Sequence, residues 1–247
     1  MWLTHSSLKL AHTQHVSQRT VHLVHHGVRL VPFLFFQVWH SNTRCRANRG
    51  IGLELTKQLL QSPGNVVVAA CRDPTKADSL QSLKSSAGGR LHVVRLDVND
   101  KQTIQDAAQE TAKVVGEKGI DYLINNAGIV RQCRHSSVRW LPYLTIGIDQ
   151  IPGGADTAFT MNLDDLITVF KTNLAGPASV SQTFVTLVEK SKKKTIINIS
   201  STLGSIETSP LGPGAASYSI AKAGLNMLVR WHLHALPTLV QRVLMTD

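Results

Sequence analysis

The chain has 247 residues, of which 43% are hydrophobic and 17% charged, a length and composition that suit one large α/β domain with a sizeable core. Its three cysteines are widely spaced, so they form neither a metal motif nor a disulfide framework, and they fit a reducing compartment such as the cytoplasm. The net charge of +10 would suit an acidic partner, but no basic patch interleaved with aromatic residues supports binding of nucleic acid.

The first 46 residues differ in composition from the rest of the chain. Six basic residues and seven of the eleven histidines precede Glu54, which is the first acidic residue. We interpret residues 1–46 as a basic extension and expect it to be solvated and disordered. A mitochondrial transit peptide is an alternative that the arginines and the lack of acids would suit, although the many histidines and the weak amphipathic pattern count against it.

Two further interpretations of this extension carry less support. The apolar run at 28–39 has about a dozen residues and contains Arg29 and Pro32, whereas a membrane span needs about twenty, so we expect no membrane segment. Three histidines at 22–26 have a spacing that suits one helix face. No cysteine or carboxylate accompanies them, so we expect no metal site.

From Ala47 onward, predicted strands and helices alternate. Near-continuous apolar runs indicate strands buried on both faces, and amphipathic stretches between them indicate helices. This alternation predicts an α/β fold in which a parallel sheet carries helices on both faces. The predicted strands span 65–71, 91–98, 121–125 and 195–201, and the predicted helices span 53–61, 101–116, 162–190 with a bend at Gly176–Pro177, and a segment starting near Ala216.

The turn at 47–52 has the features of a phosphate-binding loop. Gly50 would allow close approach of the backbone and Gly52 close packing of the helix, while the helix N-terminus would offer amides to a phosphate. Arg72 directly follows the next predicted strand, where an acidic residue selects NAD and an arginine accommodates the 2′-phosphate of NADP. A capping or surface charge is the alternative for Arg72.

Tyr218 and Lys222 are four residues apart, so on a helix they share one face. A cation one turn away favours the phenolate, so we expect Lys222 to lower the pKa of Tyr218. The strand before this helix delivers Ser200 and Ser201, and a serine hydroxyl can orient a carbonyl oxygen. These groups predict an acid–base site that interconverts a carbonyl and an alcohol. The alternative is a half-buried ring beside a solvated amine.

The chain contains five motifs, Ala47-Asn-Arg-Gly-Ile-Gly, Asn125-Asn-Ala-Gly, Lys171-Thr-Asn-Leu-Ala-Gly, Ile199-Ser-Ser and Tyr218-x-x-x-Lys222. They occur in the order found in the short-chain dehydrogenase/reductase family, which the chain resembles over about 47–128 and 154–229. Its closest similarity is to the carbonyl-reductase-like branch that includes fungal ketoreductases and the C-factor type. The resemblance implies a Rossmann-like doubly wound fold.

The resemblance also implies roles for individual residues. Tyr218 would be the general acid/base, and Lys222 would lower its pKa and hold the nicotinamide ribose. Ser201 would hydrogen-bond the substrate carbonyl, and Asn173 would position the water of a proton relay with Lys222. The cofactor would be NADP rather than NAD, bound by Tyr218 and Lys222 together with Arg49, Gly50, Ile51, Gly52, Arg72, Asp97, Val98, Asn125, Ala127 and Gly128.

The chain departs from the family pattern in three segments, so we expect an incomplete sheet. Cys45-Arg46 stands where the family has Thr-Gly. The first strand is expected near 38–45, where the sequence is irregular and polar. The apolar run Phe33–Trp39 is a less favoured alternative for this strand. An insert occupies about 130–152. A tail at 231–247 replaces the family's last strands. The predicted organisation is an extension (1–46), a Rossmann-like domain (47–230) and this tail.

These observations predict an NADP-dependent oxidoreductase that reduces a small-molecule ketone or aldehyde. The alternative is a catalytically silent relative, or the product of a truncated gene, that does not bind the cofactor productively. All four tryptophans fall in the three departing segments, which suggests that those segments have a different origin. By analogy with the family, the helices at about 160–190 and 216–230 would pair copies in a homo-oligomer.

Overall fold

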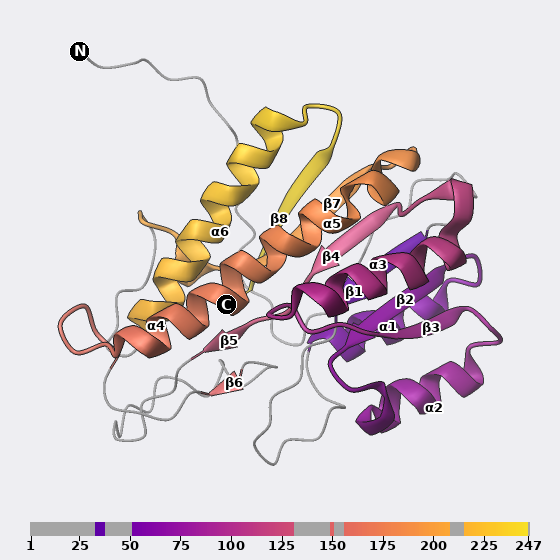
Figure 1. Cartoon of the computed structure of the whole chain (residues 1–247), viewed down its shortest axis with the longest axis horizontal. Coiled ribbons are helices and arrows are strands. Elements are labelled where there is room, and N and C mark those ends of the chain that lie inside the picture. Colours follow the sequence, from indigo (N-terminus) through magenta and orange to yellow (C-terminus); the bar gives the residue numbers. More distant parts are fainter. Residues whose placement is uncertain (1–32, 38–50, 131–148, 151–155, 208–214, 247) are drawn as a thin grey trace.

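The structure is a computed structural model that describes residues 33–37, 51–130, 149–150, 156–207 and 215–246 (Figure 1). Its main sheet is parallel, in the order β3-β2-β1-β4-β7-β8, and a small sheet pairs β5 with β6. The strands are β1 (Phe33–Gln37), β2 (Val66–Cys71), β3 (Leu91–Arg95), β4 (Tyr122–Asn125), β5 (Ile129–Val130), β6 (Asp149–Gln150), β7 (Thr195–Ser201) and β8 (Val240–Thr246).

The helices lie where the amphipathic stretches predict them. Asp100 and Asn162 cap two of them, because their side chains accept hydrogen bonds from amides of the first turn. The long helix predicted for 162–190 is interrupted by a π-helical turn, Lys171–Ala175, just before the predicted bend. The helices are α1 (Ile51–Gln61), α2 (Asp78–Ser86), α3 (Lys101–Val115), α4 (Leu163–Phe170), α5 (Gly176–Lys190) and α6 (Ala216–Ala235).

The apolar run of β2 shows why the sheet is covered on both faces. Its side chains alternate between two hydrophobic clusters. Val68 and Ala70 join the cluster that lies under α3 and α5, whereas Val67, Ala69 and Cys71 join the cluster under α1 and α2. Figure 1 shows α3, α5 and α6 running across one face of the sheet. The α/β fold with a doubly wound parallel sheet is therefore confirmed.

The first strand lies upstream of its expected position. The range 38–45 falls outside the described residues, and β1 is instead formed by the apolar run Phe33–Gln37 that we disfavoured. It pairs in regular parallel register with β2 and with β4, so it occupies the centre of the sheet. A central parallel strand is covered on both faces, which suits Phe-Leu-Phe-Phe far better than the polar residues after Trp39.

The expectation that the strands after β7 are missing is also wrong in part. Helix α6 continues to Ala235, and β8 then pairs with β7 in parallel along the whole length of both strands. Leu239, directly before β8, is buried in the cluster beneath α3 and α5. The tail therefore contributes to the core, although the division of the chain into three parts remains a prediction.

The small sheet brings the start of the insert next to a strand near its end. Ile129 pairs with Asp149, and Val130 pairs with Gln150. Residues 131–148 and 151–155 of this region, like most of the basic extension with its histidines, lie outside the described residues. In the described part of the chain, no helix combines the length and apolar character needed to cross a membrane.

The packing of the tail can be tested with two leucines. Leu239→Ala should lower the free energy of unfolding by about 2–5 kcal/mol, because it leaves a cavity in the core. The matched variant Leu233→Ala, at a side chain on α6 that is 47% exposed, should change it by less than about 1 kcal/mol. Urea unfolding measures both, and equal losses would show that the tail is not packed into the core.

Candidate functional site

The order of the sheet defines a place where a ligand can bind. The chain runs from β1 outward through β2 to β3, and then returns to the other side of β1 to form β4, β7 and β8. In open parallel sheets, ligands bind beyond the carboxyl ends of the strands at the point where the strand order reverses. Here that point lies between β1 and β4, and the predicted site residues that follow β2, β3, β4 and β7 lie at the same edge.

Helix α6 places Tyr218 and Lys222 on its buried face. Each side chain is only 3% exposed. The Lys222 ammonium donates a hydrogen bond of 2.6 Å to the carbonyl of Ile199 in β7, and it lies 5.5 Å from the centre of the Tyr218 ring. The four-residue spacing therefore brings phenol and amine together against the last residues of β7, as predicted.

Ser201 ends β7 and belongs to the same cluster. It is buried, its hydroxyl oxygen accepts the amide of Leu203, and it hydrogen-bonds the phenol of Tyr218. The short turn that follows, Thr202–Gly204, packs on α6 so closely that a Cβ at Gly204 would lie 2.8 Å from the backbone carbonyl carbon of Lys222. Only glycine fits at this contact without a shift of the backbone.

The pKa shifts at the site follow from burial. Burial raises the pKa of Tyr218 to about 12, and the hydrogen bond from Ser201 opposes that rise only in part. Burial lowers the pKa of Lys222 to about 8. The expected lowering of the tyrosine pKa by the lysine is therefore not found, since loss of hydration disfavours both charged forms.

Asn173 lies in the π-helical turn between α4 and α5 and is fully buried. Its side-chain amide makes two hydrogen bonds with the backbone of Ile129. The side-chain oxygen accepts the Ile129 N–H at 2.8 Å, and the side-chain nitrogen donates to the Ile129 carbonyl at 2.7 Å. Pro177, four residues further on, has no N–H to donate to the Asn173 carbonyl. A Cβ at Gly128 would lie 3.5 Å from the Asn173 side-chain oxygen and 3.8 Å from Lys222 Nζ, so both residues flank this glycine.

The residues after β2 and β3 lie at the same edge of the sheet as the ends of β4 and β7. Arg72, which is half-buried, directly follows β2. The next residue, Asp73, accepts hydrogen bonds from Thr75 and pairs with Lys76 at 3.0 Å, and these contacts lower its pKa to about 2. Asp97 and Val98 follow β3, and Val98 packs so closely on Gly176 that a Cβ there would lie 2.8 Å from the valine Cβ.

The residues after β4 and at the start of α1 complete the predicted cofactor set. Asn125 donates to Asn198 in β7 and to Ser181 in α5, so its amide ties the sheet to a helix. Ala127 is buried, and Gly128 follows it. Ile51 and Gly52 begin α1, whose first amides have no partner within the helix. Arg49 and Gly50 lie outside the described residues, and the cofactor roles of the whole set remain predictions.

Sequence reasoning missed two residues that hold the site together. Asn226 accepts a hydrogen bond from the Ser200 hydroxyl at 2.7 Å and donates to the carbonyl of Gly204. It lies four residues after Lys222, so helical spacing alone could have indicated it. Asp156 accepts hydrogen bonds from the start of α6, and nothing in its sequence surroundings points to this contact.

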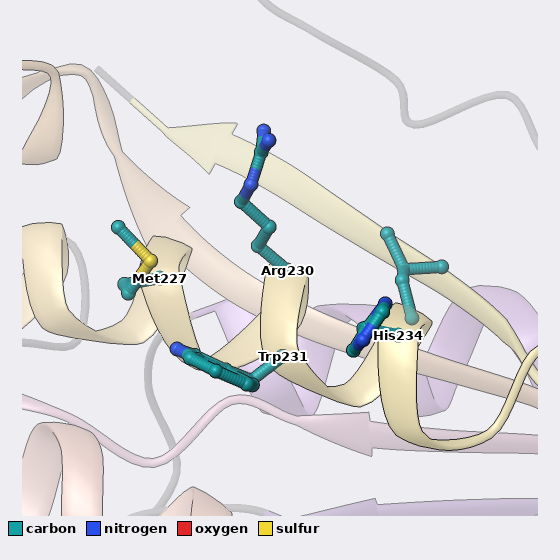
Figure 2. A pocket seen from close by; sticks show the side chains of 5 residues that line it. Met227, Arg230, Trp231 and His234 are labelled. Atoms are coloured by element: carbon teal, nitrogen blue, oxygen red, sulfur yellow. The ribbon is translucent and has the colours of Figure 1, made fainter.

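A groove of about 520 Å³ lies on a different face of α6, lined by Met227, Arg230, Trp231, Leu233 and His234. Figure 2 shows these side chains along the last turns of the helix, beside β8. Met227 lies nine residues after Tyr218, and Trp231 lies nine residues after Lys222. Nine residues are two and a half helical turns, so Met227 and Trp231 project to the opposite side of the helix. The groove is therefore separate from the cluster of Ser201, Tyr218 and Lys222.

Comparisons with known proteins agree with this arrangement. The short-chain dehydrogenase/reductase iacC of Pestalotiopsis fici is 32% identical over 193 residues, which are 74% of this chain and 63% of that protein. An uncharacterized oxidoreductase of Schizosaccharomyces pombe is 34% identical over 184 residues, covering 74% of this chain and 62% of that protein. The NADPH-bound carbonyl reductase from chicken fatty liver superposes with a TM-score of 0.70 at 30% identity, covering 88% of this chain and 79% of that one.

The chain thus spans less than two thirds of the length of these two curated relatives. A family profile described as short chain dehydrogenase matches residues 46–239, which is well over half of the chain and includes all five sequence motifs. The matched range also extends beyond residue 229, where the resemblance seen in the sequence ends. On these findings, the chain belongs to the short-chain dehydrogenase family.

Proposed function

We propose that the chain is an NADP-dependent oxidoreductase that reduces a small-molecule ketone or aldehyde. The observation that carries the proposal is the buried cluster of Ser201, Tyr218 and Lys222 at the end of β7, beside the point where the strand order reverses. A hydroxyl, a phenol and an amine that lie close together can orient a carbonyl oxygen and move a proton to it. The similarity to a carbonyl reductase supports the same substrate class.

The residues after β2 fit NADP better than NAD. Arg72 is in the position from which an arginine accommodates a 2′-phosphate. The neighbouring acid, Asp73, already accepts a hydrogen bond from Thr75 and pairs with Lys76, so these contacts compete with an unphosphorylated ribose for its carboxylate. The similar carbonyl reductase was solved with NADPH. When bound, NADPH would supply the hydride for the carbonyl carbon.

The protein would supply the proton. With its pKa raised to about 12, Tyr218 is protonated near neutral pH, so its phenol can donate a proton to the carbonyl oxygen of a substrate. The hydroxyl of Ser201 would donate a hydrogen bond to that same oxygen and so hold it next to the phenol. These roles favour the direction of reduction.

Lys222 would return a proton to the phenolate. Its pKa of about 8 leaves most molecules protonated at neutral pH yet makes loss of a proton easy, as a relay requires. Asn173 and Lys222 lie on either side of Gly128. The backbone carbonyl of Asn173 receives no hydrogen bond from residue 177, because that residue is a proline and has no N–H. We propose that this carbonyl holds the water that connects Lys222 to solvent.

A catalytically silent relative is the second candidate, favoured by a specific observation. Tyr218 and Lys222 are only 3% exposed, which leaves little of either residue for a substrate to reach. Thermal unfolding with NADPH separates the two candidates, since a ligand at 100 times its Kd stabilises the folded state by about 2.7 kcal/mol. No stabilisation at millimolar NADPH would favour the silent relative.

The choice of cofactor can be tested at Arg72. Arg72→Ala should weaken NADPH binding by about 10- to 100-fold, because a charge-assisted contact is worth about 1.5–3 kcal/mol, and should leave NADH binding nearly unchanged. Titration of the protein with each cofactor measures this. Arg230→Ala, at an exposed site on α6, changes the net charge by the same amount as Arg72→Ala and should affect the binding of neither NADPH nor NADH. Equal loss for both cofactors would contradict a contact with the 2′-phosphate.

The proton donor can be tested with a matched pair of tyrosines. Tyr218→Phe should lower kcat for ketone reduction by about 10²- to 10⁴-fold and leave the Kd for NADPH within a few-fold, since it removes only the proton donor. Tyr122→Phe, in β4, should leave kcat nearly unchanged. Steady-state kinetics with binding measurements check both, and an active Tyr218→Phe enzyme would refute the assignment.

The buried amine should make stability depend on pH. The folded-state pKa of Lys222 is about 8 and its unfolded value is about 10.4, so between these values the unfolded chain binds the extra proton and stability rises with pH. Relative to Lys222→Met, the wild type should gain on the order of 1 kcal/mol for each pH unit from 8 to 10, and nothing below 8. Urea unfolding at several pH values measures this difference, and a constant difference would disprove the shift.

A further inference from the structure

Helix α6, which carries Tyr218 and Lys222, begins without a capping side chain of its own. Its N-cap residue is Ala215, and its first turn contains no acidic residue. The first N–H groups of a helix have no acceptor within the helix, and leaving such groups buried and unbonded is unfavourable. The amides of Ala216 and Ser217 therefore need acceptors from another part of the chain.

Asp156, 61 residues before Ser217 in the sequence, supplies those acceptors. Its backbone carbonyl accepts the Ala216 amide at 3.1 Å. Its carboxylate accepts the Ser217 amide at 3.1 Å through Oδ2 and the Ser217 hydroxyl at 2.8 Å through Oδ1. Both Asp156 and Ser217 are 0% exposed, so these bonds form away from solvent.

A carboxylate is well suited to this position. The N-terminus of a helix carries a partial positive charge, which stabilises a nearby anion. Hydrogen bonds to an ionised acceptor are also shorter and stronger than those between neutral groups. The contact joins the segment before α4 directly to the first turn of α6.

We propose that Asp156 is a positioning residue of the reductase site, holding the first turn of α6 so that the Tyr218 phenol stays against Ser201. The inference rests on the proposed function. Ser217 is the peptide neighbour of Tyr218, so any shift of the first turn moves the phenol with it. A displacement of about 1 Å at a reacting group can lower a rate by about 100-fold.

The test compares Asp156→Ala with Asp156→Asn in the full chain. Asp156→Ala removes the carboxylate, so kcat for a ketone should fall about tenfold or more. The Kd for NADPH should stay within about threefold, because most of the predicted cofactor residues lie outside α6 and Lys222 is held separately by the Ile199 carbonyl. Asp156→Asn keeps an oxygen for the Ser217 amide and should restore most of kcat. Asp164→Ala, an exposed acid in the first turn of α4, should behave as wild type.

Hydrogen exchange gives a readout that does not depend on activity. In Asp156→Ala, the amides of residues 216–219 should exchange at least tenfold faster, with no change in the second half of α6, and Asp156→Asn should recover the protection. A fall in kcat without faster exchange, or faster exchange with unchanged kcat, would overturn the proposal. If the wild type reduces no carbonyl compound, the proposed function fails, and exchange alone decides whether Asp156 anchors the helix.

Discussion

The packing of α6 against the end of β7 is the contact on which the site depends. A buried ammonium without an acceptor would be strongly unfavourable, so the 2.6 Å hydrogen bond from Lys222 to the Ile199 carbonyl fixes where the helix rests on the strand. Gly204 makes the close approach sterically feasible. Tyr218, one turn earlier on the helix, and Ser201, two residues later on the strand, are both placed by this contact.

Much of the fold follows from the sequence because most strands are apolar runs covered on both faces. β2 and β7 were predicted almost residue for residue from their hydrophobic character. The spacing of the family motifs points to residues 38–45 for the first strand, whereas the apolar run at 33–36 indicates the position that β1 has. β8 is not indicated by the sequence because it is an edge strand, with Val240 and Leu244 left 42% exposed, and so carries a much weaker hydrophobic signal than a strand covered on both faces.

The site was predictable where its chemistry depends on local spacing. The four-residue separation of Tyr218 and Lys222 fixes their common face, and strand ends in a parallel sheet fall at one edge. Two features were beyond such reasoning. The pKa of Tyr218 depends on its burial, which no local pattern reports. The contact of Asp156 with α6 joins segments that are distant in the chain, and only the folded structure brings them together.

The central place of β1 has a practical consequence for protein production. The family profile begins at residue 46, and a fragment trimmed to the matched range 46–239 is an obvious choice for expression. Such a fragment would lack β1, leaving β2 and β3 with no hydrogen-bonded link to β4 and β7, and it would also lack β8. The stretch that looks least like the family therefore supplies the strand that joins the two halves of the sheet.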